Sequence, residues 1–347
     1  MDDGDDPAAP RTPAPPDRRP GEEPVDMRIL FPLYQPAQEV GGRWATRTYP
    51  GNNPQEGRDS LAHHFLKQSH EVERDPGRKR EFTDAANLLD WEAHDELLVL
   101  GHRYRVVRIE RYVRFVDDEP DLPLPTEPAA PFAPPENESV RSAMNYGIDL
   151  TADTKLESDP DAVRAAVCGL VPAGGPVPRE VTEDALVRHL AYPEVVVLPP
   201  DFQPMVNRVD DRAWHPFGDS WTVPEEAREF LLRHLEHRSR KDDEWNADST
   251  PEERNAYRKA LESCGAEGPG DSIDVLPLRY RIARVIRVVR VGFDGPEPPR
   301  DSDPDPYQPP AAQQQEAREQ GLLDDYDEGP PPRPGRAARR FLPGDRT

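Results

Sequence analysis

Two stretches of the chain repeat one arginine-studded pattern, and this repeat restricts the possible folds more than any other feature. Residues 103–115 read RYRVVRIERYVRF, and residues 279–291 read RYRIARVIRVVRV. Leu100–Phe115 aligns without gaps on Leu276–Val291 at an offset of 176, with eight identities in sixteen positions. The β-branched and aromatic residues between the arginines favour a strand over a helix. The fold must therefore accommodate two similar long strands.

The similarity continues upstream of each arginine run, in the same order. The segment PQEGRDSLAHHFL at 54–66 aligns with PEEAREFLLRHLE at 224–236 at an offset of 170. Further upstream, ILFPLYQP at 29–36 matches VLPPDFQP at 197–204 at an offset of 168. Collinear blocks of this kind indicate an internal duplication.

We therefore predict two copies of one unit, at residues 27–118 and 194–294. Each copy is expected to contain a short strand followed by a Gln-Pro loop, a second strand, two helices and a hairpin. Pro54 and Pro224 fit the first turn of a helix, where proline is tolerated. Thr222 is expected to cap the helix of the second copy. This order predicts an α+β fold in which the two tandem units pack together.

Proline-rich and acidic stretches surround these copies. The chain has 347 residues, 44 of them proline, and 32% of its residues are charged. Such segments bury too little apolar surface to form a core, so both ends are predicted to be disordered. The predicted segments outside the copies are a tail at 1–26, a linker at 119–158, a helical connector at 159–193 and a Pro/Asp/Arg-rich tail at 295–347.

The net charge of -23 opposes the approach of nucleic acids and anionic membranes at long range. No apolar run reaches the ~18 residues that a membrane-spanning helix needs. Two cysteines, Cys168 and Cys264, cannot build a disulfide framework and fit a reducing compartment. The acidic, proline-rich N-terminus does not resemble a signal peptide. We therefore expect a cytoplasmic protein.

The arginines recur at every third position of both runs. In a strand, alternate residues point to opposite faces, so this spacing places successive arginines on opposite sides. One interpretation is a twisted strand whose arginines pair with the abundant acids; the alternative is a basic ribbon that contacts phosphates or a partner. The residues in question are Arg105, Arg108, Arg111, Arg114, Arg281, Arg284, Arg287 and Arg290.

Catalytic and metal-binding patterns are weak in this sequence. FGDSW at 217–221 contains the Gly-Asp-Ser core of GDSL-type hydrolases, but the other blocks of that family are missing. His234 and His237 lie one helical turn apart, a spacing that can hold a metal, yet no third ligand is evident. We predict no catalytic, cofactor-binding or metal-binding residues. An enzyme with a site near His234 and Ser220 remains an alternative.

The C-terminal tail contains one candidate docking segment. AAQQQEAREQGLLDD at 311–325 can form a short helix that ends at Gly321 and presents Leu322 and Leu323. A compact apolar point in a polar tail can serve as a docking peptide.

Several segments of the second copy are similar to an uncharacterised actinobacterial family of unknown function, of the kind found in Streptomyces. The similarity lies in RYRIARVIRVVRVGFDGPEPPRDSDPDP at 279–306, AYPEVVVLPPDF at 191–202 and TVPEEAREFLLRHL at 222–235. It covers mainly residues 190–306 and implies no catalytic residue. We therefore predict a non-catalytic protein-interaction module with a protein partner. The alternative is a nucleic-acid-associated protein that uses the arginine strands.

Overall fold

The computed structural model describes residues 26–125, 127, 147–150, 178–209, 211, 213–240, 249–264, 270–322, 329–335 and 340–343. Nearly all of the predicted N-terminal tail, much of the linker at 119–158, the first part of the connector at 159–193, Cys168 and Leu323 lie outside these residues.

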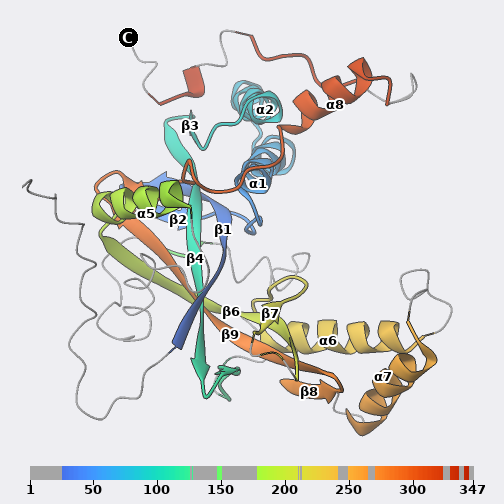
Figure 1. The fold of residues 1–347 in the computed structure, drawn as a ribbon. Helices are drawn as coiled ribbons and strands as arrows, with labels where there is room; N and C mark the ends of the chain where they lie inside the picture. Colours follow the sequence, from blue (N-terminus) through green and yellow to red (C-terminus); the bar gives the residue numbers. More distant parts are fainter. Residues whose placement is uncertain are drawn as a thin grey trace, which may run out of the picture.

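Four strands of 15 residues each form the centre of the molecule (Figure 1). They are β1 (Asp26–Val40), β4 (His102–Val116), β6 (Glu194–Arg208) and β9 (Leu278–Gly292). The sheet runs in the order β2-β1-β4-β9-β6-β7, and its neighbouring strands are antiparallel. The two arginine runs are β4 and β9, and they lie side by side at the middle of this curled sheet.

Helices and short strands lie towards the two ends of the long strands. The first end carries β2 (Arg43–Thr46), α1 (Pro54–Lys67), the π-helix η1 (Gln68–Val72), α2 (Pro76–Trp91), β3 (Glu96–Val99) and, from the second half of the chain, β10 (Gly295–Pro296). The second carries β7 (His215–Pro216), α6 (Pro224–Ser239), α7 (Pro251–Cys264), β8 (Ser272–Val275) and, from the first half, β5 (Glu119–Pro120). Two further helices are α5 (Arg179–Ala191) and α8 (Pro310–Glu319). The described residues thus form a mixed α/β fold.

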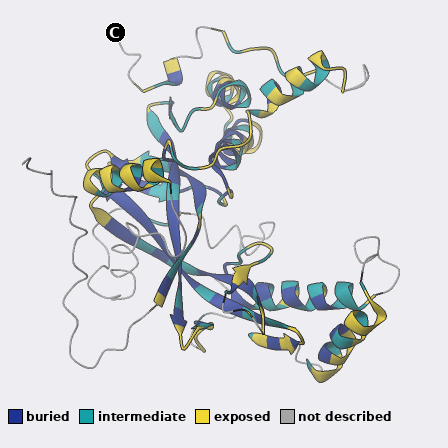
Figure 2. Cartoon of the chain, in the orientation of Figure 1, coloured by how far each residue is buried: buried dark blue, intermediate teal, exposed yellow. Residues whose placement is uncertain are grey.

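Burial follows this arrangement (Figure 2). The crossing strands are buried along most of their length, whereas α5 and α8 are largely exposed. One apolar cluster joins α1, α2 and the β3–β4 hairpin, and a second joins α6, α7 and the β8–β9 hairpin. Each helix pair therefore covers its own end of the sheet.

Corresponding residues of the two halves repeat the same contacts. The guanidinium carbons of Arg103 and Arg105 lie 5.3 and 5.2 Å from the ring centroid of Trp44. Those of Arg279 and Arg281, at an offset of 176, lie 5.2 and 5.7 Å from Trp214. Both indoles are buried, as expected for core anchors that also attract cations.

The register of the sheet also relates the halves to one another. The bulge between Leu30 and Leu33 in β1 recurs between Leu198 and Asp201 in β6. Arg111 of β4 pairs with Arg287 of β9, and these two positions correspond at the offset of 176. Because equivalent residues of antiparallel neighbours face one another, an approximate two-fold axis passes close to this pair.

Several predicted boundaries need correction. β1 and β6 are long strands that include the Gln-Pro dipeptide, which the sequence indicated to be a loop. Pro36 lies opposite Val106 of β4, and its carbonyl accepts a hydrogen bond from the Arg47 N–H, 2.9 Å away. In the second half Val223 is the N-cap of α6 and no side chain caps it, so Thr222 does not have the predicted role.

The C-terminal tail is more ordered than predicted within the described residues. Glu297 is fully buried and Arg300 is 8% exposed, because both join a cluster of charged residues at the centre. Helix α8 ends at Glu319, two residues before the predicted end at Gly321, whose φ of +69° suits the glycine that follows a helix cap. Phe341 is 1% exposed and packs in the apolar cluster of the first helix pair. These contacts could not be predicted from the charge and proline content of the tail.

Candidate functional site

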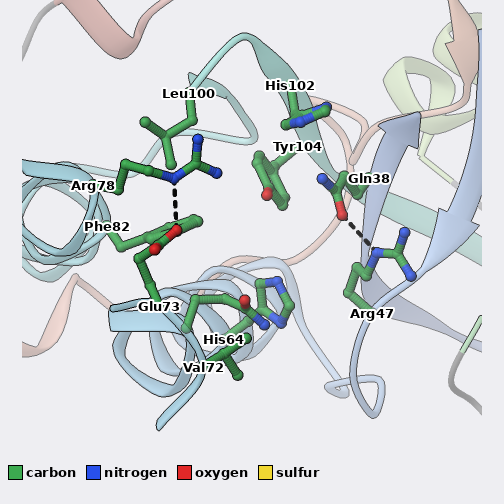
Figure 3. Close-up of a pocket in the computed structure, with 11 residues that line it drawn as sticks. Gln38, Arg47, His64, Val72, Glu73, Arg78, Phe82, Leu100, His102 and Tyr104 are labelled. Carbon is green, nitrogen blue, oxygen red and sulfur yellow. Dashed lines mark hydrogen bonds and ion pairs between the residues drawn. The ribbon is translucent and has the colours of Figure 1, made fainter. Parts of the chain in front are cut away.

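A pocket of about 480 Å³ lies in the first half, between the helices and the β3–β4 hairpin (Figure 3). Its walls come from β1, the segment after β2, the end of α1, η1, the start of α2 and the hairpin. Its lining residues are Gln38, Arg47, His64, Gln68, Val72, Glu73, Arg78, Phe82, Leu100, His102 and Tyr104. Most of these side chains can form hydrogen bonds.

Local structure explains how one wall of the pocket forms. Helix α1 continues into the π-helical turn η1, which contains Gln68 and Val72. A π-helical turn is wider than an α-helical one and often occurs at functional sites. Helix α2 then begins at Pro76 after its cap, Asp75. In the β3–β4 hairpin, Leu100 and Gly101 both have positive φ, as a tight two-residue turn requires.

A histidine and a tyrosine form the buried end of the pocket. The ring centroids of His64 and Tyr104 are 5.9 Å apart, and the side chains are 6% and 3% exposed respectively. Burial lowers the pKa of His64 to about 4, and the positive charge of Arg47 adds to this effect. The imidazole is therefore neutral at physiological pH and presents a flat, weakly polar face.

Charged groups face each other across the pocket (Figure 3). On one side Arg47 donates from Nε to Oε1 of Gln38, 2.8 Å away. On the other side Arg78 donates from Nε to Oε2 of Glu73, 2.6 Å away. Backbone N–H groups and Arg78 lower the pKa of Glu73 to about 2. The lining thus contains two guanidinium groups, one carboxylate and the neutral imidazole of His64.

The corresponding site of the second half keeps the histidine and the tyrosine. His234 and Tyr280 lie at the offsets that relate the halves to His64 and Tyr104, and their ring centroids are 5.5 Å apart. Burial lowers the pKa of His234 to about 4 as well. The ring of Phe217 lies against both, with its centroid 5.1 Å from His234 and 5.4 Å from Tyr280. An aromatic side chain thus occupies this site.

Backbone contacts show that Phe217 stands where the first half has Arg47. The N–H of Arg47 donates to the carbonyl of Pro36, and the N–H of Phe217 donates to the carbonyl of Pro204. These pairs are related by the offsets of 170 and 168. The two positions thus share this backbone hydrogen bond and differ in their side chain.

Two more lining residues of the first half have apolar counterparts. Gln38 pairs with Tyr104 in the sheet, as Val206 pairs with Tyr280. His102 closes the hairpin opposite Val99, as Leu278 does opposite Val275. Val206, Phe217 and Leu278 all pack in the second apolar cluster. Three polar positions around the pocket thus correspond to three apolar positions in the filled site.

The arginines predicted to contact phosphates or a partner lie on alternating faces of β4 and β9, and carboxylates surround them. The outer ones pair with acids near the strand ends: Arg105 with Glu96 and Asp294, Arg114 with Asp121, Arg281 with Asp274 and Glu119, and Arg284 with Glu127. The sheet therefore does not gather all eight on one exposed face. Contact with phosphate remains a prediction.

The inner arginines are buried. Arg287 is fully buried, and its Nη1 lies 3.1 Å from Oδ1 of Asp201. Arg111 donates from Nη2 to Oε1 of Gln203, 2.9 Å away. Burial beside Arg287 lowers the pKa of Arg111 to about 10.

Glu110 is the centre of a second buried cluster. Its Oε1 accepts from Arg108 at 3.0 Å and from Arg300 at 2.8 Å. Its Oε2 accepts from the Tyr112 hydroxyl at 2.7 Å and from Arg290 at 3.1 Å. These arginines hold the pKa of Glu110 below its usual value although burial alone would raise it. These charged side chains therefore connect β4 and β9, one strand from each half, with the C-terminal segment that contains Arg300.

The two residues of the alternative enzyme site, Ser220 and His234, have different hydrogen-bond partners. Ser220 donates to Asp201 at 3.3 Å, whereas His234 faces the Tyr280 hydroxyl at 3.4 Å. No group of three His, Cys, Asp or Glu residues that could hold a metal occurs in the part of the chain that is described. Leu322, the described half of the predicted docking segment, is 72% exposed.

Sequence reasoning missed the pocket. The signal was present in the alignment of the two copies, since Arg47 aligns with Phe217 and Gln38 with Val206. Differences between apolar and polar residues at partly buried positions of a repeat mark a place where the two copies differ in packing. That signal can be interpreted only when the structure shows which positions line the same pocket.

Comparison with known protein families identifies the relationship. The pattern of DUF5954, a family of unknown function, matches residues 20–306. The chain belongs to the DUF5954 family. The match extends over both halves and so exceeds the region 190–306 that the sequence motifs suggested. Comparisons with curated proteins and with solved structures gave no match. None of the described helices is long and apolar enough to span a membrane.

Proposed function

We propose that this DUF5954 protein is a non-catalytic protein-interaction module with an internally duplicated scaffold. Its recognition site is the pocket of the first half, and the filled site of the second half has a structural role. The observation that supports this proposal most strongly is the packing of Phe217 against His234 and Tyr280. An aromatic side chain packs, in one half, at the position where the other half has Arg47 and a pocket.

The chemistry of the lining favours binding over catalysis. General acid–base catalysis works best with a group whose pKa lies near the working pH. His64, with a pKa of about 4, and Glu73, with a pKa of about 2, are both far below neutrality. Hydroxyl, amide and guanidinium groups can orient a ligand without forming a bond to it.

The scaffold suits this role because its charges are satisfied internally. Ion pairs hold the arginine strands and leave the pocket as a defined recess at one end of the sheet. A cytoplasmic location, the actinobacterial lineage suggested by the motifs and a protein as partner belong to the same proposal.

A selection experiment tests the proposal. Random peptides displayed on phage are selected on the full chain and then counter-selected on Arg47→Phe, which places in the pocket the ring found in the second half. We expect peptides that bind the original chain at least tenfold more tightly than the variant, on the order of the effect of filling a recognition pocket. Peptides that bind both equally, or no enriched peptide, would overturn the proposal. Thermal melting verifies that the variant folds.

A further inference from the structure

Helix α5 contacts the rest of the molecule through its polar side. The Oδ2 atom of Asp184 accepts hydrogen bonds from the backbone N–H and the hydroxyl of Ser302, at 3.2 and 2.6 Å. On the same side of the helix, the buried Arg290 donates from Nη1 to Nδ1 of His189, 2.8 Å away. The buried residue of α5 is the small Ala185. Polar contacts therefore hold this helix in place.

The opposite side of α5 exposes large apolar side chains (Figure 2). Leu186, Val187 and Leu190 are 49%, 62% and 74% exposed. Their spacing makes them neighbours on the helix surface. Phe293 is also exposed, and it follows Gly292, whose backbone closely approaches the last residue of α5. We call the surface formed by Leu186, Val187, Leu190 and Phe293 the α5 face.

This orientation of α5 is the reverse of the usual one. A helix on the surface of a globular protein ordinarily buries its apolar stripe and exposes its charged residues. Large apolar side chains that are exposed next to one another mark interaction sites in soluble proteins. Because polar contacts position α5, its apolar side chains contribute little to the packing of the fold. They are therefore available to a partner.

Carboxylates border the α5 face. Glu183 lies three residues before Leu186 and forms an ion pair with Arg179 at 2.6 Å. Glu180 is exposed at the start of the helix, and Glu194 is exposed just beyond its end. The chain as a whole has a net charge of -23, so a second copy would bring like charges together. The border and the total charge both favour a basic partner.

We propose that the α5 face docks an amphipathic helix of another protein that carries lysine or arginine beside its apolar stripe. The apolar stripe packs on Leu186, Val187 and Leu190, and the basic residues face Glu180 and Glu194. A helix is the segment whose side chains match the spacing of α5. The 13 residues of α5 extend over about 20 Å, which a partner helix of about four turns covers. The residues that line the pocket lie outside α5, so this surface is additional to the recognition site proposed above.

A selection among displayed helices tests this inference. The helices have about 16 residues, a length at which isolated helices become stable. Leucines form one face of each helix, and the flanking positions vary among lysine, glutamate and glutamine. They are selected on the full chain and counter-selected on the triple variant Leu186→Ser, Val187→Ser and Leu190→Ser. This variant has the same net charge as the original chain, so the counter-selection removes helices that are attracted by charge alone.

We expect lysine to be enriched at the flanking positions of the selected helices. A selected helix should bind the original chain at least about tenfold more tightly than the triple variant, as for the loss of central apolar contacts. Glu180→Gln combined with Glu194→Gln should weaken binding by about threefold, as expected for exposed ion pairs. The matched control is Val116→Ser, Leu124→Ser and Val209→Ser, which replaces three exposed apolar side chains outside α5 and should leave binding unchanged. Thermal melting verifies that the variants fold.

Several results would overturn the inference. Equal binding to the original chain and to the triple variant would show that the α5 face makes no contact. Enrichment of glutamate or glutamine in place of lysine would contradict the basic partner, and the absence of any enriched helix would contradict docking. A dimer in analytical ultracentrifugation that the triple variant abolishes would assign the α5 face to a second copy of the chain instead.

Discussion

Both ends of the sheet carry the same histidine–tyrosine pair, but different side chains surround this pair at the two ends. In the second half Phe217, Val206 and Leu278 fill it with apolar atoms. In the first half Arg47, Gln38 and His102 line a pocket of about 480 Å³ instead. The sheet register is shared by both halves, whereas the π-helical turn η1 and the positive φ of Gly218 each occur in only one half of the described residues. Side chains and local backbone together thus separate a packed core from a recess.

The largest effect is expected at the ionic centre that both halves share. Glu110 corresponds to the apolar Ile286, so the buried carboxylate exists on one side only. Glu110→Gln leaves Arg108, Arg290 and Arg300 facing a neutral amide, and we expect a loss of about 3–5 kcal/mol in the free energy of unfolding. Urea denaturation measures it.

The control for this change is an exposed ion pair. Arg179 and Glu183 pair on α5 with side chains that are 86% and 59% exposed. Glu183→Gln should change the free energy of unfolding by less than about 0.5 kcal/mol. Equal effects of the two substitutions would show that burial does not determine how much these charges contribute to the free energy of unfolding.

The next largest effect is expected when the filled site is emptied. Phe217→Ala removes the ring between His234 and Tyr280, and we expect a loss of about 2–3 kcal/mol, somewhat below that for a fully buried phenylalanine. The variant should also gain a weak site for phenol, detectable by calorimetry. A loss below about 0.5 kcal/mol would mean that Phe217 does not hold the second half together.

Acid should weaken both halves through their histidines. The pKa values of His64 and His234 are lowered from 6.5 to about 4, so the unfolded chain binds protons that the folded chain refuses. This contribution to stability is complete above pH 6.5 and is lost as the pH falls towards 4. Between pH 7 and pH 5 each histidine should account for about 1–2 kcal/mol.

His64→Gln isolates the share of the first half in this pH dependence. The variant should lose roughly half of the fall in the free energy of unfolding that the two histidines cause, as followed by urea titrations at several pH values. His63→Gln is the control, because His63 is the exposed neighbour of His64 on α1. An unchanged pH dependence in His64→Gln would mean that its imidazole is accessible to protons in the folded state.

The smallest effect is a gain of stability. Arg47→Phe gives the first half the side chain of the second, and burial of the ring in the pocket should stabilise the fold by about 1 kcal/mol. Arg43→Phe, at an exposed position of the same segment, should give no gain. A destabilised Arg47→Phe would show that the two backbones differ more than their hydrogen bonds indicate.

Most of the fold could be predicted from the internal repeat. The arginine runs predicted the two long strands, the hairpins at Gly101 and Pro277 followed from the alignment, and Pro54 and Pro224 marked the starts of α1 and α6. The β1 strand was underestimated because a Gln-Pro dipeptide is typical of a loop. The partial order of the tail was missed because the burial of Glu297 depends on residues almost 190 positions away, such as Arg108, whose backbone N–H donates to the carbonyl of Glu297. Local composition contains no information on such contacts.

The pocket could be predicted only in part. The pairing of His64 with Tyr104 joins two elements 40 residues apart, and their aligned partners at His234 and Tyr280 were visible in the sequence. The empty space beside them was not, because it results from side chains that do not fill it. A pocket is a property of packing, and periodicity reports only which faces are apolar.

Tyrosine NMR tests the central claim most directly. Tyr104 and Tyr280 occupy corresponding positions, one beside the pocket and one beside Phe217. The chain is labelled with 13C on its tyrosine rings, the two signals are assigned with Tyr104→Phe and Tyr280→Phe, and a peptide selected on the full chain is added. We predict that the Tyr104 signal shifts in a saturable manner while the Tyr280 signal stays in place. Equal shifts of both signals, or a shift of Tyr280 alone, would contradict the assignment of recognition to the first half.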